Sequence, residues 1–485
     1  MQRRALQCLQ RLRCMYRHAS GFATDSANGA TKEQTQLMAH LRAKILMRGG
    51  PISMAEYMQD ALTSPQGGFY MHRDVFGKQG DFITSPEISQ MFGEMLGVWA
   101  VHTWASLGRP SRLGLVELGP GRGTLMADML RATAGFTDFA RAVEVHLVEV
   151  SPALRALQWK TLGCAPHPLV PGSPPLPPSS SPSSASPPPH LHLSGEAVGQ
   201  GGSGVGAQAC PTLGVRGKLN TEVAWHSSLD AVPRSLPALF IAHEYFDALP
   251  VHQFVKDPQR GWVEKMVDVE EGGEGEGPQG LRLVLSPAAT PAAALLVKRR
   301  LAAMAADEAA ACSALEVGAQ AMAAAEALAL RVGAQGGAAL VVDYGREGHY
   351  SDSVMAIKEH RGVELLSQPG TADLSAWVDF TALRAGALGS GAPVRVSGPI
   401  NQADFLLQLG MGQRLQQLLK KASPEQASDL VSGFQRLTDT QTEAGMGQSY
   451  KVMAITHEVD VEPAGFDGAM SVTQQQRAKQ HNPSC

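Results

Sequence analysis

The stretch from Leu113 to Leu130, LGLVELGPGRGTLMADML, constrains the fold of this chain more than any other. Residues 113–118 form a short apolar run of the length expected for a buried strand. Three glycines alternate with other residues directly after this run, and an apolar helical spacing capped by Thr124 follows. Because glycine lets a backbone turn tightly and approach a ligand without a Cβ, this stretch predicts the first unit of a nucleotide-binding α/β sheet.

The glycine spacing separates two classes of ligand. A dinucleotide site reads G-x-G-x-x-G and places a diphosphate on the helix N-terminus. Here the pattern is E-x-G-x-G-x-G, and a second strand, predicted over 143–148, ends before an acidic residue placed to accept hydrogen bonds from two ribose hydroxyls. No basic residue directly follows that acid, which disfavours a 2′-phosphate. The predicted cofactor residues are Glu117, Gly119, Gly121, Gly123 and Glu149; a turn that only packs a helix on a strand is the alternative.

Six longer blocks carry a family resemblance. They are GDFITSPEISQMFGEMLGVW (80–99), VELGPGRGTLMADMLR (116–131), HLVEVSPALRALQ (146–158), AHEYFDALPVHQF (242–254), PGTADLSAWVDF (369–380) and MGQSYKVMAI (446–455). Together they resemble the MidA family, mitochondrial protein arginine methyltransferases that assist assembly of respiratory complex I. The resemblance covers about residues 35–455, is interrupted by two inserts, and implies S-adenosyl-L-methionine as the cofactor.

The order of strands and helices predicts the fold class. Alternating strand and helix signals favour an α/β fold with a mostly parallel sheet and helices on both faces, and the resemblance implies a Rossmann-like methyltransferase fold. An N-terminal helical segment is expected to cover the edge of the sheet. The predicted parts are a transit peptide (1–32), the helical segment (33–112), the core (113–456) and a disordered tail (457–485). Within the core we expect a disordered Pro/Ser/Gly insert (163–220), an acidic Gly-rich hairpin tip (268–280) and an Ala-rich helical region (286–333).

The first residues resemble a targeting segment. Five arginines precede the first acidic residue, Asp25, and Leu6, Leu9 and Leu12 can share one helical face. This composition is typical of an organelle transit peptide, although a retained basic helix and a chloroplast destination are alternatives. The family resemblance implies mitochondria, and within them the matrix. A net charge of −4 gives no broad basic field for nucleic acid, and no apolar run approaches the roughly 20 residues that span a bilayer.

The predicted catalytic residues lie in the block HEYFDALP, directly after a fourth strand predicted over 238–242. A guanidinium is a delocalised cation without a free lone pair, so a site that methylates it needs carboxylates that orient it and stabilise its charge. Glu244 and Asp247 supply such carboxylates at the carboxyl end of a strand, where ligands bind in this kind of sheet. Tyr245 and Phe246 are expected to wall a guanidinium or an adenine. The alternative is that Asp247 caps the turn and Glu244 is solvated.

Further candidates come from two other blocks. In TSPEISQMFGE, Thr84 and Ser85 are expected at the cofactor entrance, with Ser85 capping a helix. Glu87 and Glu94 lie seven residues apart, so one helix face could present both to a substrate, or both to solvent. Asp343 ends a fifth strand predicted over 339–343 and is expected to face the same crevice, or to be a turn residue.

Other chemistry finds little support in the sequence. The six cysteines are scattered without a C-x-x-C pair, which argues against a zinc site or a disulfide framework. No H-x-x-x-H, catalytic triad or Walker pattern indicates a metal or phosphoryl reaction. Asp373 and Asp379 are predicted to be caps or turn formers, with a substrate contact left open.

The function predicted from these residues and the resemblance is protein arginine methylation with S-adenosyl-L-methionine. The resemblance implies the 49-kDa subunit of complex I as the protein substrate, symmetric dimethylation of its arginine, and a need for the protein in complex I assembly. A non-catalytic assembly chaperone and a small-molecule methyltransferase are the alternatives, while the glycine spacing disfavours an NAD-dependent oxidoreductase. The sequence does not indicate an oligomeric state.

Overall fold

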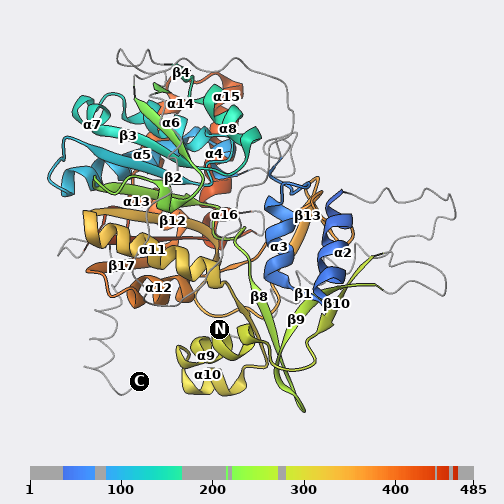
Figure 1. Cartoon of the computed structure of the whole chain (residues 1–485). Helices are drawn as coiled ribbons and strands as arrows, with labels where there is room; N and C mark the ends of the chain where they lie inside the picture. Colours follow the sequence, from blue (N-terminus) through green and yellow to red (C-terminus); the bar gives the residue numbers. More distant parts are fainter. Residues whose placement is uncertain are drawn as a thin grey trace, which may run out of the picture.

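A computed structural model describes residues 36–71, 84–166, 215–216, 221–270, 280–442, 445–457 and 463–467. Its centre is a ten-stranded sheet (Figure 1). Five strands run parallel in the middle, in the order β6 (Glu222–His226), β3 (Val143–Val148), β2 (Leu113–Leu118), β7 (Ala238–His243) and β12 (Gly337–Arg346). The Rossmann-like α/β prediction is confirmed.

Shorter or antiparallel strands extend this sheet at both edges. Beyond β12 lie two antiparallel strands, β18 (Tyr450–His457) and β17 (Val394–Asn401). Beyond β6 lie β5 (Val215–Arg216) and β4 (Ala165–Pro166), and β16 (Val378–Asp379) pairs with the end of β12. The strand β17 was not predicted.

Helices cover both faces of the sheet because its strands are apolar on both sides. In β2, Leu115 packs in the cluster with α5 (Gln90–Ser106) and α6 (Thr124–Thr133), whereas Val116 packs in the cluster with α11 (Ala319–Gln335) and α12 (Phe380–Gly389). All six residues of β2 are buried, as expected for a central parallel strand. Two shorter helices, α7 (Thr137–Ala142) and α8 (Pro152–Thr161), flank β3 in the sequence.

The sequence of residues 402–421 predicts a last, single helix, but the structure differs from this prediction. The chain forms α13 (Gln402–Gln408) and α14 (Met411–Leu419), followed by α15 (Pro424–Thr438) and α16 (Met446–Ser449). The break falls at Gly410, whose φ of 93° lies in the left-handed region that an α-helix cannot contain. The prediction of one continuous helix was therefore wrong.

A second sheet carries the N-terminal helices. It contains β1 (Ile52–Ser53), β9 (Gly261–Val269), β8 (His252–Asp257), β11 (Ala314–Val317) and β10 (Leu281–Leu285). The expected hairpin is confirmed, since β10 pairs antiparallel with β9. The helices α2 (Gln36–Arg48) and α3 (Met54–Thr63) share a buried cluster with Val267 of β9. These two helices therefore cover the second sheet, not the edge of the main sheet as expected.

The Ala-rich region contains more than helices. It forms a π-helical turn, η2 (Ala293–Val297), and two short α-helices, α9 (Lys298–Ala302) and α10 (Ala306–Ala311). The chain then enters β11 before α11 begins. The strand β11 pairs antiparallel with β8, and this pairing overrides a local composition that favours helix. A third, small sheet contains β14 (Arg361–Val363), β13 (Met355–Lys358) and β15 (Asp373–Ser375).

The helix expected to carry Glu87 and Glu94 is divided in two. The first turn, α4 (Ser85–Ile88), has Thr84 and not Ser85 at its N-cap position, and Ser89 is its C-cap. Ser89 is extended, with a φ of −157°, and its hydroxyl caps the following helix α5. Because the two glutamates lie on separate helices, the expectation that they share one helix face was wrong.

Several predicted segments lie outside the described residues. These are the leader, most of the Pro/Ser/Gly insert, most of the acidic hairpin tip and most of the tail, so the division of the chain into parts stays a prediction. Within the described ranges, no helix has both the length and the apolar character needed to cross a bilayer.

Candidate active site

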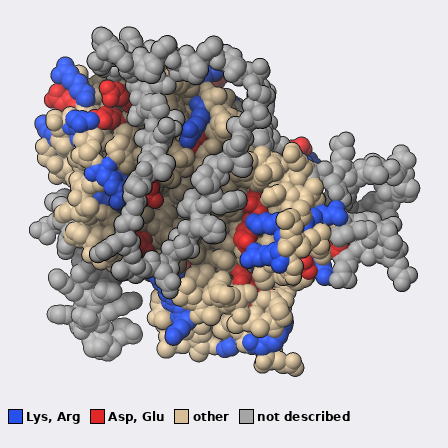
Figure 2. Space-filling view, viewed as in Figure 1, with Lys and Arg blue, Asp and Glu red and all other residues tan. Residues whose placement is uncertain are grey.

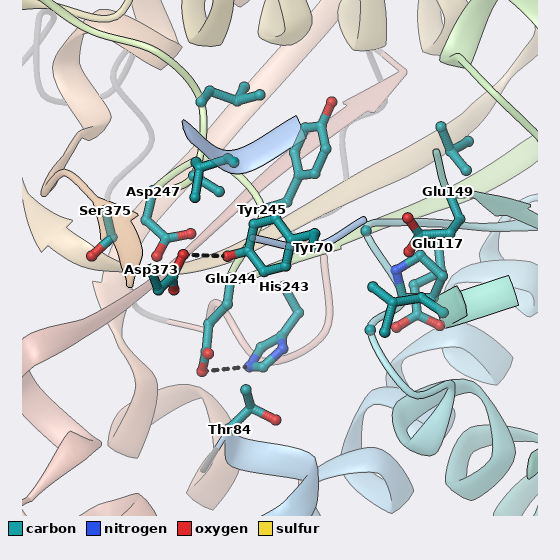
Figure 3. A pocket seen from close by; sticks show the side chains of 18 of the residues that line it. Tyr70, Thr84, Glu117, Glu149, His243, Glu244, Tyr245, Asp247, Asp373 and Ser375 are labelled. Carbon is teal, nitrogen blue, oxygen red and sulfur yellow. Dashed lines mark hydrogen bonds and ion pairs between the residues drawn. The ribbon is translucent and has the colours of Figure 1, made fainter. Parts of the chain in front are cut away.

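The carboxyl ends of the central strands open into one cavity of about 600 Å³. The strand β2 has β3 on one side and β7 on the other, so the strand order reverses there, which is where ligands bind in such sheets. Figure 3 shows Glu117 and Glu149 at one end of this cavity and Glu244, Asp247 and Asp373 at the other, with Tyr70 and Tyr245 between them. We call the first the cofactor end and the second the acidic end.

The glycine turn shapes the cofactor end. Gly119 and Gly121 line the cavity and have φ values of 62° and 51°, which L side chains rarely adopt. A Cβ on Gly119 would come within 3.2 Å of Tyr245 Cδ2. Gly123, with a φ of 80°, does not line the cavity. A Cβ on Gly123 would lie 3.4 Å from Gln158 of α8. Two of the three glycines therefore bound the cavity, and the third lets α8 approach the turn.

Glu149 lies directly after β3, as predicted, and its carboxylate is held on both oxygens. The Ser151 backbone N–H donates to Oε1 at 2.8 Å, and the Gln158 amide donates to Oε2 at 3.1 Å. Burial raises the pKa of this carboxyl group, while these hydrogen bonds oppose the rise. Each oxygen keeps lone pairs beyond these bonds, which suits acceptance from two ribose hydroxyls.

Glu117 ends up buried beneath the glycine turn. Its side chain lines the cavity, and Oε2 has no hydrogen-bond partner among the described residues. Burial raises the pKa of Glu117 to about 8. A cation such as an ammonium or a sulfonium would favour the ionised carboxylate. Glu117, the glycine turn and Glu149 therefore fit a ligand that carries both a ribose and a positive charge, as S-adenosyl-L-methionine does.

At the acidic end, Glu244 begins the turn that follows β7. Its φ of 47° is in the left-handed region, and its backbone N–H donates to the Val342 carbonyl at 2.9 Å. The carboxylate accepts hydrogen bonds from the Tyr450 hydroxyl and the Ser85 backbone N–H. Its Oε1 atom is buried and forms no hydrogen bond with the described residues, although His243 Nε2 lies 3.4 Å from it (Figure 3). Burial, and then the nearby Asp247, raise the pKa of Glu244 to about 8.

Asp247 faces the same space from the other end of that turn. Its carboxylate accepts a hydrogen bond from the Tyr344 hydroxyl, and its Oδ1 atom is buried with no partner in the described part of the chain. Burial raises the pKa of Asp247 to about 6. The two predicted catalytic carboxylates are therefore brought together, and each keeps one unused acceptor oxygen.

Asp343 holds this turn from behind. Its Oδ2 accepts from the backbone N–H groups of Phe246 (3.0 Å) and Asp247 (3.3 Å), and its Oδ1 accepts from Tyr344 N at 2.9 Å. It is fully buried and does not line the cavity. Phe246 is also buried and packs in the apolar cluster against α11. The positions of Asp343 and Phe246 therefore do not support the substrate contacts predicted for them. Both residues fix the turn instead.

The block from Thr84 to Glu94 divides in the same way. Thr84 and Glu87 line the cavity, and Glu87 forms an ion pair with Arg122 of the glycine turn at 3.4 Å. Ser85 is buried outside the lining and reaches the site through its backbone N–H. Glu94 is 2% exposed and forms ion pairs with Arg131 (3.1 Å) and Arg414 (2.7 Å). Its position therefore does not support the substrate contact expected for it.

Several site residues were missed by the sequence reasoning. Tyr70 donates its hydroxyl to Asp373 Oδ1 at 2.7 Å, and its carbonyl accepts from Ser151 Oγ at 2.6 Å. Tyr344, Tyr450 and Trp377 complete an aromatic wall around the acidic end. Aromatic residues carry no spacing signal of their own, so only the tertiary structure identifies them. Gln158 had a weak signal, as a polar residue on the buried face of α8.

The cavity is strongly acidic. Six carboxyl side chains line it: Glu87, Glu117, Glu149, Glu244, Asp247 and Asp373. Arg122 is the single Lys or Arg among the described lining residues, and it already pairs with Glu87. On the outer face seen in Figure 2, by contrast, charged side chains of both signs are interspersed. The charge of the cavity therefore favours positively charged ligands.

Comparisons with known proteins agree with this geometry. Residues 95–399 match a family described as "Putative S-adenosyl-L-methionine-dependent methyltransferase". The chain is 37% identical to the mouse "Protein arginine methyltransferase NDUFAF7, mitochondrial" over 93% of this chain and 90% of that protein. It is 38% identical to the human protein of the same name, covering 87% and 83% of the two chains.

A solved structure shares the fold. A crystal structure of a protein from Burkholderia thailandensis bound to S-adenosyl-homocysteine superposes with a TM-score of 0.66 at 24% identity, over 93% of this chain and all of that one. The family match spans well over half of the chain, and the mouse and human relatives are covered over most of their length. The chain therefore belongs to the MidA-like family of S-adenosyl-L-methionine-dependent methyltransferases.

Proposed function

We propose that this methyltransferase acts on arginine side chains of a protein. The observation that carries the proposal is that two buried acceptor atoms, Glu244 Oε1 and Asp247 Oδ1, form no hydrogen bond with the described residues. His243 Nε2 comes only within 3.4 Å of Glu244 Oε1, outside hydrogen-bond geometry. Buried acceptors without donors cost about 1–3 kcal/mol each, so such a pair in a cavity points to a ligand that supplies donors. A guanidinium offers five N–H donors in one plane together with a positive charge.

The chain's residues can serve this chemistry in three ways. Bound S-adenosyl-L-methionine supplies an electrophilic methyl group on a sulfonium. Glu244 and Asp247 accept N–H groups and orient the guanidinium plane, and Tyr450 and Tyr344 fix those two carboxylates. The aromatic wall excludes water and so strengthens these charge interactions.

Glu244 is also suited to accept a proton. A guanidinium nitrogen that gains a methyl group must lose a proton, and the pKa of Glu244, raised to about 8, lies close to neutral pH. A cation bound beside Glu244 would lower this pKa and keep the carboxylate ionised until that proton is released. Asp247, with a pKa of about 6, is better suited to remain a charge partner.

For the protein substrate we propose the 49-kDa subunit of complex I, with symmetric dimethylation and a role in complex I assembly in the mitochondrial matrix. The family resemblance supports this substrate, and the mouse and human relatives are named as mitochondrial protein arginine methyltransferases. The Arg-rich, acid-poor first residues support the location.

The test is transfer of a labelled methyl group. The protein is incubated with radiolabelled S-adenosyl-L-methionine and the 49-kDa subunit, and the hydrolysed product is analysed for methylated amino acids. We expect label in symmetric dimethylarginine. Label in small molecules but not in protein would favour a small-molecule methyltransferase. No label at all, with assembly restored in cells by Glu244→Gln, would favour a chaperone.

A further inference from the structure

The side chain of Gln158 lies directly behind the residues that form the cofactor end and does not itself line the cavity. It is fully buried in α8 and has three hydrogen-bond partners. Its Nε2 donates to the Gly121 carbonyl at 2.8 Å and to Glu149 Oε2 at 3.1 Å, and its Oε1 accepts from Trp225 Nε1 at 2.8 Å. One amide therefore joins the glycine turn after β2 to the acid after β3.

The orientation of this amide follows from its partners. An indole N–H can only donate, so the amide oxygen must face Trp225. The two N–H groups then face two acceptors, a carbonyl and a carboxylate, and every hydrogen-bonding group of the amide is used. A reversed amide would place its oxygen against both acceptors. Trp225 therefore fixes which way Gln158 points.

The stem of Gln158 is fixed as well. Its Cα and Cγ lie 3.4 Å from the Cβ position of Gly123, so the third glycine of the turn leaves room for it. Trp225 in turn stacks on Trp159, the next residue of α8, with ring centroids 5.7 Å apart. Neither the amide nor its donor can move without disturbing the turn or the stack.

We propose that Gln158 is a positioning residue for recognition of the cofactor ribose. Its amide binds both the Glu149 carboxylate and the glycine turn. The distance between the carboxylate that accepts the ribose hydroxyls and the loop that contacts the rest of the cofactor is therefore fixed. Ser151 N–H holds the other carboxylate oxygen, and the two bonds together set the carboxylate plane. The inference concerns cofactor binding alone and is independent of the arginine proposal.

The experiment is calorimetric titration of the full chain with S-adenosyl-homocysteine and with its 2′-deoxyribose analogue. Gln158→Met keeps a long unbranched stem and removes the amide. We expect its affinity for S-adenosyl-homocysteine to fall about 10- to 100-fold, the loss expected for a hydrogen bond to a charged group. We also expect the ratio between the affinities for the two ligands to shrink, because a displaced Glu149 no longer accepts a hydrogen bond from the 2′-hydroxyl of the ribose.

Two variants complete the test. Trp225→Phe keeps an aromatic ring but removes the donor that orients the amide, and we expect a smaller shift of the ligand ratio in the same direction. Lys160→Met, on the exposed side of α8, should bind both ligands like the wild type. The unfolding temperature without ligand shows whether each variant is folded.

The inference is overturned if Gln158→Met binds S-adenosyl-homocysteine within about twofold of the wild type. It is equally overturned if the affinities for both ligands fall together and their ratio stays constant, since a purely structural role predicts that result. Should Gln158→Met fail to fold, an unchanged ratio in Trp225→Phe would overturn it.

Discussion

The two ends of the cavity differ in how far the chain satisfies its own polar groups. At the cofactor end, both oxygens of Glu149 have donors within the fold, and the backbone takes up positive φ at glycines. At the acidic end, Glu244 takes up positive φ although it has a Cβ, and one oxygen each of Glu244 and Asp247 lacks a donor in the described chain. A strained residue with an unused acceptor is common at functional sites.

This difference separates a preformed site from one that a ligand completes. At the cofactor end, Glu117 also keeps an acceptor oxygen without a donor in the described chain, and the sulfonium of a bound cofactor can complement its charge. Glu149 and the glycine turn are already held by the fold. The acidic end is destabilised while it is empty, because burial and the nearby Asp247 raise the pKa of Glu244 to about 8 and burial raises the pKa of Asp247 to about 6. A bound cation would offset both the burial of these carboxylates and the repulsion between them. Variants at the two ends should therefore lose different functions.

The largest effect is expected from blocking the glycine turn. In Gly119→Val, the new side chain would be strained by the φ of 62° and would meet Tyr245 at 3.2 Å. We expect affinity for S-adenosyl-homocysteine to fall by more than about 100-fold, measured by calorimetry. Gly135→Ala is the matched control, since a Cβ there meets nothing within 4 Å and binding should not change. Wild-type binding by Gly119→Val would place the cofactor elsewhere.

Neutralising the acidic end should remove activity and spare cofactor binding. For Glu244→Gln and Asp247→Asn we expect methyl transfer to fall about 100- to 1,000-fold, the usual cost of losing one charge-stabilising group. Affinity for S-adenosyl-homocysteine should stay within about threefold of the wild type. If cofactor affinity fell as far as activity, the two ends would not be separable as described here.

The free protein should become less stable as the pH rises toward 8. The pKa of Glu244 is about 8 in the folded chain, against 4.5 for the ordinary carboxyl group, so the folded state holds a proton that the unfolded state has lost. Stability from this group is thus greatest at low pH and is lost as the pH rises from about 4.5 through 8, by about 2–4 kcal/mol.

Thermal unfolding at pH 5 and pH 8 measures this loss. In Glu244→Gln the difference in unfolding temperature between the two pH values should be smaller than in the wild type, because an amide does not titrate. An identical pH dependence in the two proteins would show that Glu244 is not held neutral in the empty site.

The smallest effect is expected away from both ends. Glu94 joins α5 to Arg131 of α6 and to Arg414 of α14, and it does not reach the cavity. Arg414→Met should lower the free energy of unfolding by about 1–2 kcal/mol, less than a fully buried pair because Arg414 is partly exposed and Arg131 remains. Denaturant unfolding measures this, with Arg141→Met as an exposed control. Reduced turnover in fully folded Arg414→Met would restore the substrate-binding role predicted for Glu94.

The cofactor end was largely predictable from the sequence, whereas the acidic end was predictable only in part. Glu117, the glycines and Glu149 lie within 40 residues of each other, and their positions follow from strand ends and turn chemistry. Local rules therefore sufficed, except for Gln158, whose partner Trp225 lies beyond a long insert. The placement of Glu244 and Asp247 at a strand end was also predictable from the block that contains them.

The remaining residues depend on contacts that are distant in sequence. Asp343 and Phe246 looked like substrate residues because they neighbour the right strands, but the chain needs them to fix the turn. Glu94 was misplaced because Ser89 breaks a helix that the apolar pattern continues. Tyr70 and Asp373, about 300 residues apart, meet only in the folded protein.

Proton release on substrate binding is the most direct test of the account. The protein loaded with S-adenosyl-homocysteine is titrated at pH 7 with a peptide of the 49-kDa subunit that contains the labelled arginine, in two buffers of different ionisation enthalpy. Guanidinium binding should ionise Glu244 and release about one proton in the wild type, and none in Glu244→Gln. Binding without proton release, or equal release by both proteins, would contradict a guanidinium seated on Glu244.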